Sequence, residues 1–283
     1  MPKYASFTLQ IKNQVATISI IPPAKSHIGK SANLHWELGG ALMALRTDNR
    51  VRVIVITGQG DSFLVVRPPE SYHTESGRRS RTEPRYMWES FTGTAIMHET
   101  MAQIEKPIIA KVNGDAIGFG STLVFACDLI VAREDAQIVD THMGMGEFPN
   151  VGPGEFGLLP GDGGTALIPM FMSPALAKEY LMLSRPFRAH ELARLGIINY
   201  AVPKKALNST VNDLIARLLK RSAYALAWTK RTANRPIVEQ LSKSLDPGLA
   251  YEMVNFLQWE RMGWTDTKSF DGTPSPGVPT KPG

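Results

Sequence analysis

The sequence has 283 residues and a single cysteine, Cys127, so the chain cannot form an internal disulfide bond and fits a reducing compartment. It has no apolar run of about 18 residues, so a transmembrane helix is not expected. Its first residues, MPKYASF, lack the apolar segment of a secretory signal peptide. We therefore expect a cytoplasmic protein with no membrane partner.

The composition allows a large core and shows no strong charge bias. Hydrophobic residues make up 43% of the chain, which is ordinary for a globular protein. Cys127 lies in an apolar stretch, which favours a buried structural thiol over a nucleophile. The net charge is +5, and its densest basic run is GRRSR at residues 77–81. A solvated loop is the plainer interpretation of this run, and an anchor for an anionic ligand is the alternative. No nucleic-acid partner is expected.

The stretch from Lys106 to Thr165 carries the strongest local signals. A short apolar run followed by Asn-Gly predicts a strand and a tight turn. The glycines of GFG at residues 118–120 let backbone N–H groups approach a ligand closely. A helix that begins beside them would present unpaired N–H groups to a developing oxyanion. In chain order the predicted elements are the strand 107–112, the helix 121–127 and the strand 128–132.

The rest of the chain alternates in the same way. Residues 7–21 predict a hairpin with its turn at Asn13-Gln14, and Ser31 or Asn33 can cap a helix that extends to Leu45. Strand, helix and strand in succession indicate an α/β fold with right-handed crossovers. The remaining predicted elements are a strand at 51–57 and helices at 86–104 and 246–264. Another helix begins at 173–178, and residues 203–235 hold a basic amphipathic helix with Leu214, Leu218 and Leu219 inward.

The segments KPIIAKVNGDAIGFG and ACDLIVAREDAQI resemble the crotonase (enoyl-CoA hydratase/isomerase) family, whose pattern is KPxIAxVNGxAxGGG followed by ACDxxxAxxxAxF. The flanking segments RVIVITGQGDSF and LARLGIINYAVP extend the resemblance over residues 7–203. It implies an α/β protein with a crotonase-type ββα superhelix and a C-terminal helical trimerisation region. We expect a core at 1–203, a helical region at 204–264, a disordered tail at 265–283, and a homotrimer or dimer of trimers.

The resemblance also implies an oxyanion hole made of two backbone N–H groups. The matching positions are Arg67 and Phe119, and one such donor contributes ~3–4 kcal/mol to a transition state. Around Arg67 the family carries FxxGxD, whereas this chain has Val66 and Pro68 in place of Gly and Asp. In the polar segment that follows, His73 and Trp88 are candidates to line a pocket, although a surface or packing role is the plainer interpretation.

The catalytic positions differ from those of a hydratase, which uses two glutamates. This chain has Thr122 at the first position and His142 at the second. His142 and an aspartate in a PGDG turn, Asp162, resemble the His–Asp dyad of the branch that includes 6-oxocamphor hydrolase. Residues 147–157 form an insertion between them, and the pairing survives only if this insertion bulges outward. Asp140 is a competing partner for His142 on the same face of the strand.

A second, weaker similarity to that branch is GLAYE at residues 248–252, which would direct Glu252 toward the pocket. A structural histidine and an aspartate bonded to its own turn are the plainer interpretation of His142 and Asp162. Two features weaken the case for a CoA thioester substrate: the altered loop at Arg67 and the lack of a basic EKR-type segment after Trp264. A CoA moiety therefore enters only as part of an alternative substrate, and neither a metal nor another cofactor is expected.

The leading hypothesis is hydrolytic cleavage of a carbon–carbon bond in a β-diketone, a small-molecule carbonyl substrate. His142, oriented by Asp162, would deprotonate water. Hydroxide would attack one carbonyl, and the N–H groups of Arg67 and Phe119 would hold the enolate that leaves. The alternatives are a hydratase or isomerase that acts on an acyl-CoA, and a crotonase scaffold without catalytic activity.

Overall fold

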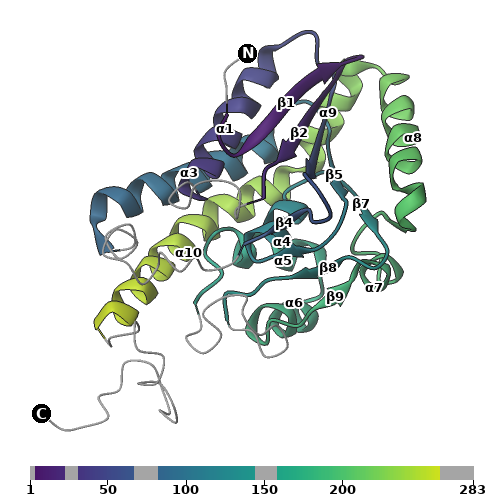
Figure 1. The fold of residues 1–283 in the computed structure, drawn as a ribbon. Coiled ribbons are helices and arrows are strands. Elements are labelled where there is room, and N and C mark those ends of the chain that lie inside the picture. Colours follow the sequence, from purple (N-terminus) through teal and green to yellow (C-terminus); the bar gives the residue numbers. More distant parts are fainter. Residues whose placement is uncertain (1–3, 23–30, 67–81, 144–157, 262–283) are drawn as a thin grey trace, which may run out of the picture.

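The computed structural model describes residues 4–22, 31–66, 82–143 and 158–261, and Figure 1 shows two β-sheets surrounded by helices. The larger sheet has six strands in the order β1-β2-β3-β5-β7-β10, with β1 and β2 antiparallel and the other neighbours parallel. Its strands are β1 Phe7–Lys12, β2 Val15–Ile20, β3 Val53–Gly58, β5 Ile108–Val112, β7 Leu129–Arg133 and β10 Tyr200–Val202.

The smaller sheet has four short strands in the order β4-β6-β8-β9. The pairs β4–β6 and β6–β8 are parallel, and β9 runs antiparallel to β8. These strands are β4 Leu64–Val65, β6 Ala116–Ile117, β8 Gln137–Val139 and β9 Phe187–Arg188. This mixed α/β architecture agrees with the fold class that the sequence predicts.

The predicted N-terminal hairpin is confirmed. Lys12 pairs with Val15, so the connection consists of Asn13 and Gln14, with φ angles of 49° and 64°. Positive φ at both central residues is typical of a type I′ turn, whose twist matches that of the strands it joins. The turn therefore fixes the register that places the apolar residues of the hairpin toward the core.

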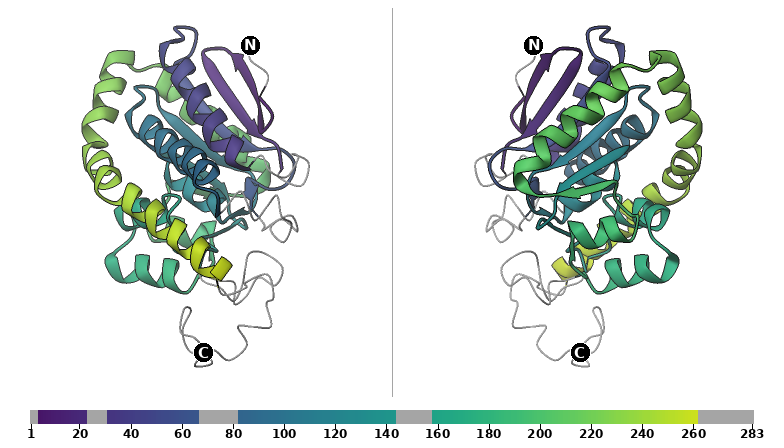
Figure 2. Two further views of the ribbon diagram at one scale, coloured as in Figure 1. Left: turned by 90° about the vertical axis from the view of Figure 1, so that its left-hand side faces the viewer. Right: turned by 90° about the vertical axis from the view of Figure 1, so that its right-hand side faces the viewer.

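The larger sheet is covered on both faces, and β3 shows how the sequence achieves this. Ile54 and Ile56 point into the main core, which also contains buried residues of α1 (Ser31–Thr47) and α3 (Pro84–Gln103). The alternate residues of β3, Val53 and Val55, pack in a second cluster with α8 (Leu207–Leu219). Because successive side chains of a strand point to opposite faces, a continuous apolar strand needs both layers. Figures 1 and 2 show α8 on the side of the sheet away from α1 and α3.

Of the remaining helices, α4 to α7 are interspersed in the chain with the strands of the smaller sheet, and the others follow β10. These helices are α4 Phe119–Phe125, α5 Gly164–Phe171, α6 Pro174–Met182, α7 Ala189–Arg194, the 3-10 helix η2 Lys204–Ala206, α9 Ala223–Ala233 and α10 Arg235–Arg261. Residues 203–235, expected to hold a basic amphipathic helix, contain two helices, because α8 ends at Leu219 and α9 begins at Ala223. The expected inward residues of α8 are confirmed: Leu214 is buried, and Leu218 and Leu219 pack against the same cluster. Ser222 caps α9 by accepting a 3.3 Å hydrogen bond from the N–H of Ala225.

The predicted start of the last helix at Asp246 is also wrong. Helix α10 begins at Arg235 and continues through Pro247. A proline in a helix interior removes one hydrogen bond and costs ~3 kcal/mol, which is why the sequence favoured a boundary there. The long helix packs against α3 and α5, and this tertiary packing offsets the local cost. Within the described residues, no helix combines the length and the apolar character needed to cross a membrane. The tail at 265–283 lies outside them.

Candidate active site

Three parallel strands of the smaller sheet end at the same edge, and the segments that follow them carry predicted site residues. Strand β4 leads to Val66, β6 leads to Gly118 and β8 leads to Asp140. Two hydrogen bonds hold these ends together: Val66 N–H donates to the Ile117 carbonyl at 3.2 Å, and Gly118 N–H donates to the Val139 carbonyl at 2.9 Å. The carboxyl edge of a parallel sheet is a common ligand-binding position in α/β proteins.

The oxyanion position begins at the turn before α4. Gly118 has φ +64° and ψ −128°, a conformation that side chains disfavour, and an added Cβ would lie 3.2 Å from Oγ1 of Thr141. Phe119 is the first residue of α4, so its N–H has no acceptor within the helix and is available to a ligand. The second predicted donor, Arg67, lies outside the described residues, as does His73.

His142 lies between two carboxylates, one on each ring nitrogen. Nδ1 of His142 is 2.7 Å from Oδ1 of Asp140, and Nε2 is 3.4 Å from Oδ2 of Asp162. The second distance is longer than an ordinary hydrogen bond. Asp140 is fully buried, and the exposed fraction of the His142 side chain is 12%. His142 and Asp162 thus lie next to each other as predicted, but the carboxylate within hydrogen-bond distance of the ring is that of Asp140.

Asp162 lies in the turn before α5, where two other elements hold it. Oγ1 of Thr122, on α4, donates to Oδ1 of Asp162 at 3.2 Å. Nε2 of His98, on α3, lies 2.7 Å from the backbone carbonyl of Asp162. A carbonyl only accepts, so Nε2 of His98 carries the hydrogen and Nδ1 bears a lone pair. Both the side chain and the backbone of Asp162 are therefore fixed by neighbouring helices.

The insertion at 147–157 lies outside the described residues, but a hydrogen bond joins the chain before it to the chain after it. The N–H of Leu158 donates to the carbonyl of His142 at 2.6 Å, which joins the two ends. Gly161 permits the close approach of the turn to α10, because an added Cβ would lie 2.5 Å from the carbonyl oxygen of Gly248. The juxtaposition of His142 and Asp162 therefore survives the insertion.

The proton distribution in the cluster follows from burial and charge. Burial by itself would lower the pKa of His142, but the charges of Asp162 and Asp140 outweigh it and raise that pKa well above its ordinary value. Burial opposes ionisation of Asp162, yet the adjacent His142 holds its pKa below the usual range. At neutral pH, His142 is therefore an imidazolium beside an ionised Asp162.

Glu252, which the sequence directs toward the pocket, is buried on α10. Burial raises the pKa of Glu252 to about 8, so its carboxyl group is protonated at neutral pH. Its Oε2 atom lies 2.6 Å from the position that a Cβ on Gly161 would occupy, next to Asp162 in the chain. A protonated and an ionised carboxyl group in one site is an arrangement that acid–base enzymes use.

Two histidines of the site have no counterpart among the sequence predictions. His98 is fully buried, and burial lowers its pKa, so it is neutral. His35, on α1, packs edge-to-face on Phe119 with ring centroids 4.3 Å apart. For His98, the sequence offers one signal: the residue follows Met97 on the buried face of α3. That pattern is more typical of a core residue than of a site residue. Trp88, in contrast, lies on α3 with 63% of its side chain exposed.

Asp140, His142 and Asp162 offer ligand atoms within 4.8 Å of one another, so they are the natural place to consider a metal ion. Nδ1 of His142 already contacts Asp140, however, and Nε2 faces Asp162, so an ion that binds one ring nitrogen would compete with the carboxylate beside it. Oδ2 of Asp140 faces Gly164, where an added Cβ would lie 2.6 Å away. The geometry suits the sharing of protons better than the binding of an ion.

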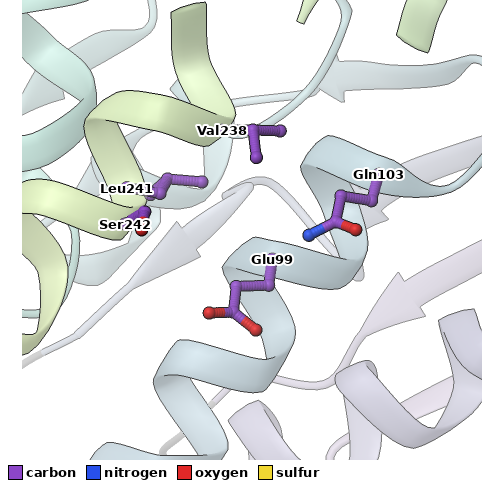
Figure 3. A pocket seen from close by; sticks show the side chains of 5 residues that line it. All are labelled: Glu99, Gln103, Val238, Leu241 and Ser242. Atoms are coloured by element: carbon purple, nitrogen blue, oxygen red, sulfur yellow. The ribbon is translucent and has the colours of Figure 1, made fainter. Parts of the chain in front are cut away.

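A separate hollow lies between α3 and α10. Its volume is about 160 Å³. Figure 3 shows the residues that line it: Glu99 and Gln103 on one helix, and Val238, Leu241 and Ser242 on the other. None of these five residues contributes to the cluster around His142. The hollow is therefore not a candidate for the reaction site.

Similarity to known proteins covers most of the chain. Residues 10–256 match the enoyl-CoA hydratase/isomerase family. A crotonyl-CoA hydratase from Syntrophomonas wolfei is 26% identical over 243 residues, which are 86% of each chain. A solved enoyl-CoA hydratase/isomerase from Mycobacterium paratuberculosis has a TM-score of 0.75 at 24% identity, covering 91% of this chain and 95% of that one. A β-diketone hydrolase from Anabaena sp. PCC 7120 has a TM-score of 0.77 at 20% identity, covering 91% and 96%.

Proposed function

The chain belongs to the enoyl-CoA hydratase/isomerase family, and within that family we propose that it hydrolyses a carbon–carbon bond of a β-diketone. The observation that carries the proposal is His142 with a carboxylate at each ring nitrogen, at a position where a hydratase of this family carries a glutamate. The similar structure from Anabaena sp. is named a β-diketone hydrolase, so this fold is compatible with such chemistry.

The first step is the activation of water. When the His142 imidazolium has lost its Nε2 proton, Nε2 bears a lone pair and can take a proton from a water molecule. Asp140 accepts the hydrogen of Nδ1 at 2.7 Å, which fixes the tautomer and stabilises the imidazolium that forms. The hydroxide then adds to one carbonyl carbon of the diketone.

The second step breaks the bond between that carbon and the central carbon. The electron pair of the bond passes into the second carbonyl group and gives an enolate, whose oxygen is placed at the N–H of Phe119. Transfer of the proton from His142 to the central carbon then releases a ketone and a carboxylic acid. One water molecule is consumed, and both of its hydrogens are accounted for in the products.

An acyl-CoA hydratase is the second candidate, because the S. wolfei relative is named a crotonyl-CoA hydratase. The protonated Glu252 and the ionised Asp162 would then serve as acid and base in place of the usual glutamates. The absence of carboxylates at Thr122 and His142 argues against this candidate.

Assays in water enriched in a heavy oxygen isotope distinguish the β-diketone hydrolase from the acyl-CoA hydratase. The purified protein is incubated with a cyclic β-diketone and, separately, with crotonyl-CoA, and products are identified by mass spectrometry. Hydrolysis of the diketone gives a keto acid with one heavy oxygen in its carboxylate, which is the expected result. Labelled hydroxyacyl-CoA without keto acid would support the hydratase. Without turnover of either substrate class, the scaffold without activity would be favoured.

A further inference from the structure

Thr122 occupies the position at which a hydratase of this family carries its first glutamate, but here it serves another residue. It lies on the first turn of α4, three residues after Phe119, and is fully buried. The first turn of α4 thus carries both the Phe119 N–H and the Thr122 hydroxyl.

The Thr122 hydroxyl decides how the Asp162 carboxylate is oriented. It donates to Oδ1 at 3.2 Å, which leaves Oδ2 as the oxygen that faces Nε2 of His142 at 3.4 Å. Asp162 itself lies in a turn between β8 and α5, outside any helix or strand. No helix or strand holds this residue, so contacts from neighbouring elements, among them the Thr122 hydrogen bond, hold its carboxylate in place.

We propose that Thr122 is a positioning residue that fixes the Asp162 carboxylate against His142 and thereby ties this pair to the helix that presents the oxyanion donor. The inference rests on the proposed function for its catalytic consequence, but the contact itself does not depend on the substrate. In this chain, the residue at the position of the first hydratase glutamate would therefore orient a carboxylate instead of acting as an acid or a base.

The shape and the hydroxyl of Thr122 can be separated by mutation. Its Cγ2 methyl group lies 2.9 Å from the position that a Cβ on Gly163 would occupy, so the methyl fills space against the turn. Thr122→Val keeps the shape and removes the hydroxyl, whereas Thr122→Ser keeps the hydroxyl and removes the methyl. A purely structural role would make the serine variant the poorer one.

Removal of the hydroxyl also has a consequence for proton affinity. Several charged or titratable groups surround Asp162: His142 and Asp140 after β8, His98 on α3, His35 on α1 and Glu252 on α10. The Thr122 hydrogen bond stabilises the ionised form of Asp162. Without it, Asp162 holds its negative charge less well, and the imidazolium of His142 is less stabilised. The pKa of His142 therefore falls in Thr122→Val.

The test combines a titration with kinetics. The imidazole of His142 is titrated by NMR in the unliganded protein, with His142→Asn to identify its signals. We expect a lower His142 pKa in Thr122→Val than in the unmodified protein, and recovery in Thr122→Ser. With a cyclic β-diketone, kcat of Thr122→Val should fall roughly tenfold or more with little change in KM. Thr57→Val, which removes a buried hydroxyl on β3 that donates to Lys111 at 2.9 Å, serves as the control.

A Thr122→Val protein that is folded and titrates like the unmodified protein would overturn the proposal. If Thr122→Val does not fold, Thr122→Ser and Thr122→Ala provide the same comparison, because serine keeps the hydroxyl group and alanine lacks it. A shifted titration in a protein that turns over no β-diketone would support the positioning role and reject the proposed function, so the two failures are distinguishable.

Discussion

Nδ1 of His142 lies 2.7 Å from Oδ1 of Asp140, a residue only two positions earlier in the chain. The same carboxylate oxygen accepts the backbone N–H of His142 at 3.0 Å. This compact loop fixes the ring immediately after β8 and directs Nε2 toward Asp162. Asp140, which orients the ring, is thus close to His142 in sequence. Asp162, which is farther along the chain, faces Nε2, the nitrogen that would exchange protons with water and substrate.

Replacement of His142 by alanine should abolish the base without unfolding the protein, since the side chain lies at the end of a loop beside the core. We expect kcat to fall by roughly two to four orders of magnitude with a cyclic β-diketone. Steady-state kinetics and thermal unfolding measure the two effects, and His190→Ala, an exposed change on α7, is the matched control. A folded His142→Ala protein with full turnover would end the mechanism.

The two carboxylates should differ in their kinetic effects. Asp140→Asn removes the charge that stabilises the imidazolium and holds the ring, so kcat should fall by roughly a hundredfold or more. Asp162→Asn should cost less than His142→Ala but far more than a surface change. In both variants the rise of kcat/KM with pH should move to lower pH, because each carboxylate raises the pKa of His142. Profiles that keep their position in both variants would contradict this electrostatic account.

Glu252 should make the protein less stable as pH rises. Its folded pKa of about 8 exceeds the ordinary value of 4.5, so the folded state binds a proton that the unfolded state has released. The contribution of Glu252 to the free energy of unfolding is therefore fully present below pH 4.5 and is lost between pH 4.5 and 8, with a total loss of at most ~5 kcal/mol. Urea unfolding across this range should show a shallower decline in Glu252→Gln. Equal slopes in the two proteins would refute the assignment.

Gly161 should tolerate no side chain. An added Cβ would lie 2.5 Å from the Gly248 carbonyl oxygen and 2.6 Å from Oε2 of Glu252, so Gly161→Ala must move the turn or α10. We expect a stability loss of roughly 1–3 kcal/mol together with reduced turnover. Gly40→Ala is the control, because nothing lies within 4 Å of an added Cβ in α1. That change should stabilise the helix by about 0.5–1 kcal/mol.

The chain should assemble as a trimer or a dimer of trimers, as the family resemblance implies. Helix α9 exposes two large aromatic side chains, Tyr224 and Trp228, which a neighbouring copy would cover. Light scattering at micromolar concentration measures the assembly directly. A stable monomer under these conditions would reject the expectation.

Much of the fold could be predicted from local patterns. The hairpin around Asn13-Gln14 was predictable because alternation and a two-residue turn act over few residues. The buried strand β3 was predictable because a continuous apolar run has few other solutions. Helix α10 was not, because its passage through Pro247 depends on packing against α3 and α5. Local propensity predicted a boundary there, and tertiary contacts overrode it.

For the site, the sequence by itself determined which chemical groups are present: a histidine after β8, an aspartate in a glycine-rich turn and no glutamate at either hydratase position. Only the tertiary structure decided how they are paired. Thr122 meets Asp162 across 40 positions of the chain and His98 meets it across 64. Sequence spacing carries no information about such contacts, because they depend on how α3, α4 and the turn before α5 converge on one buried carboxylate.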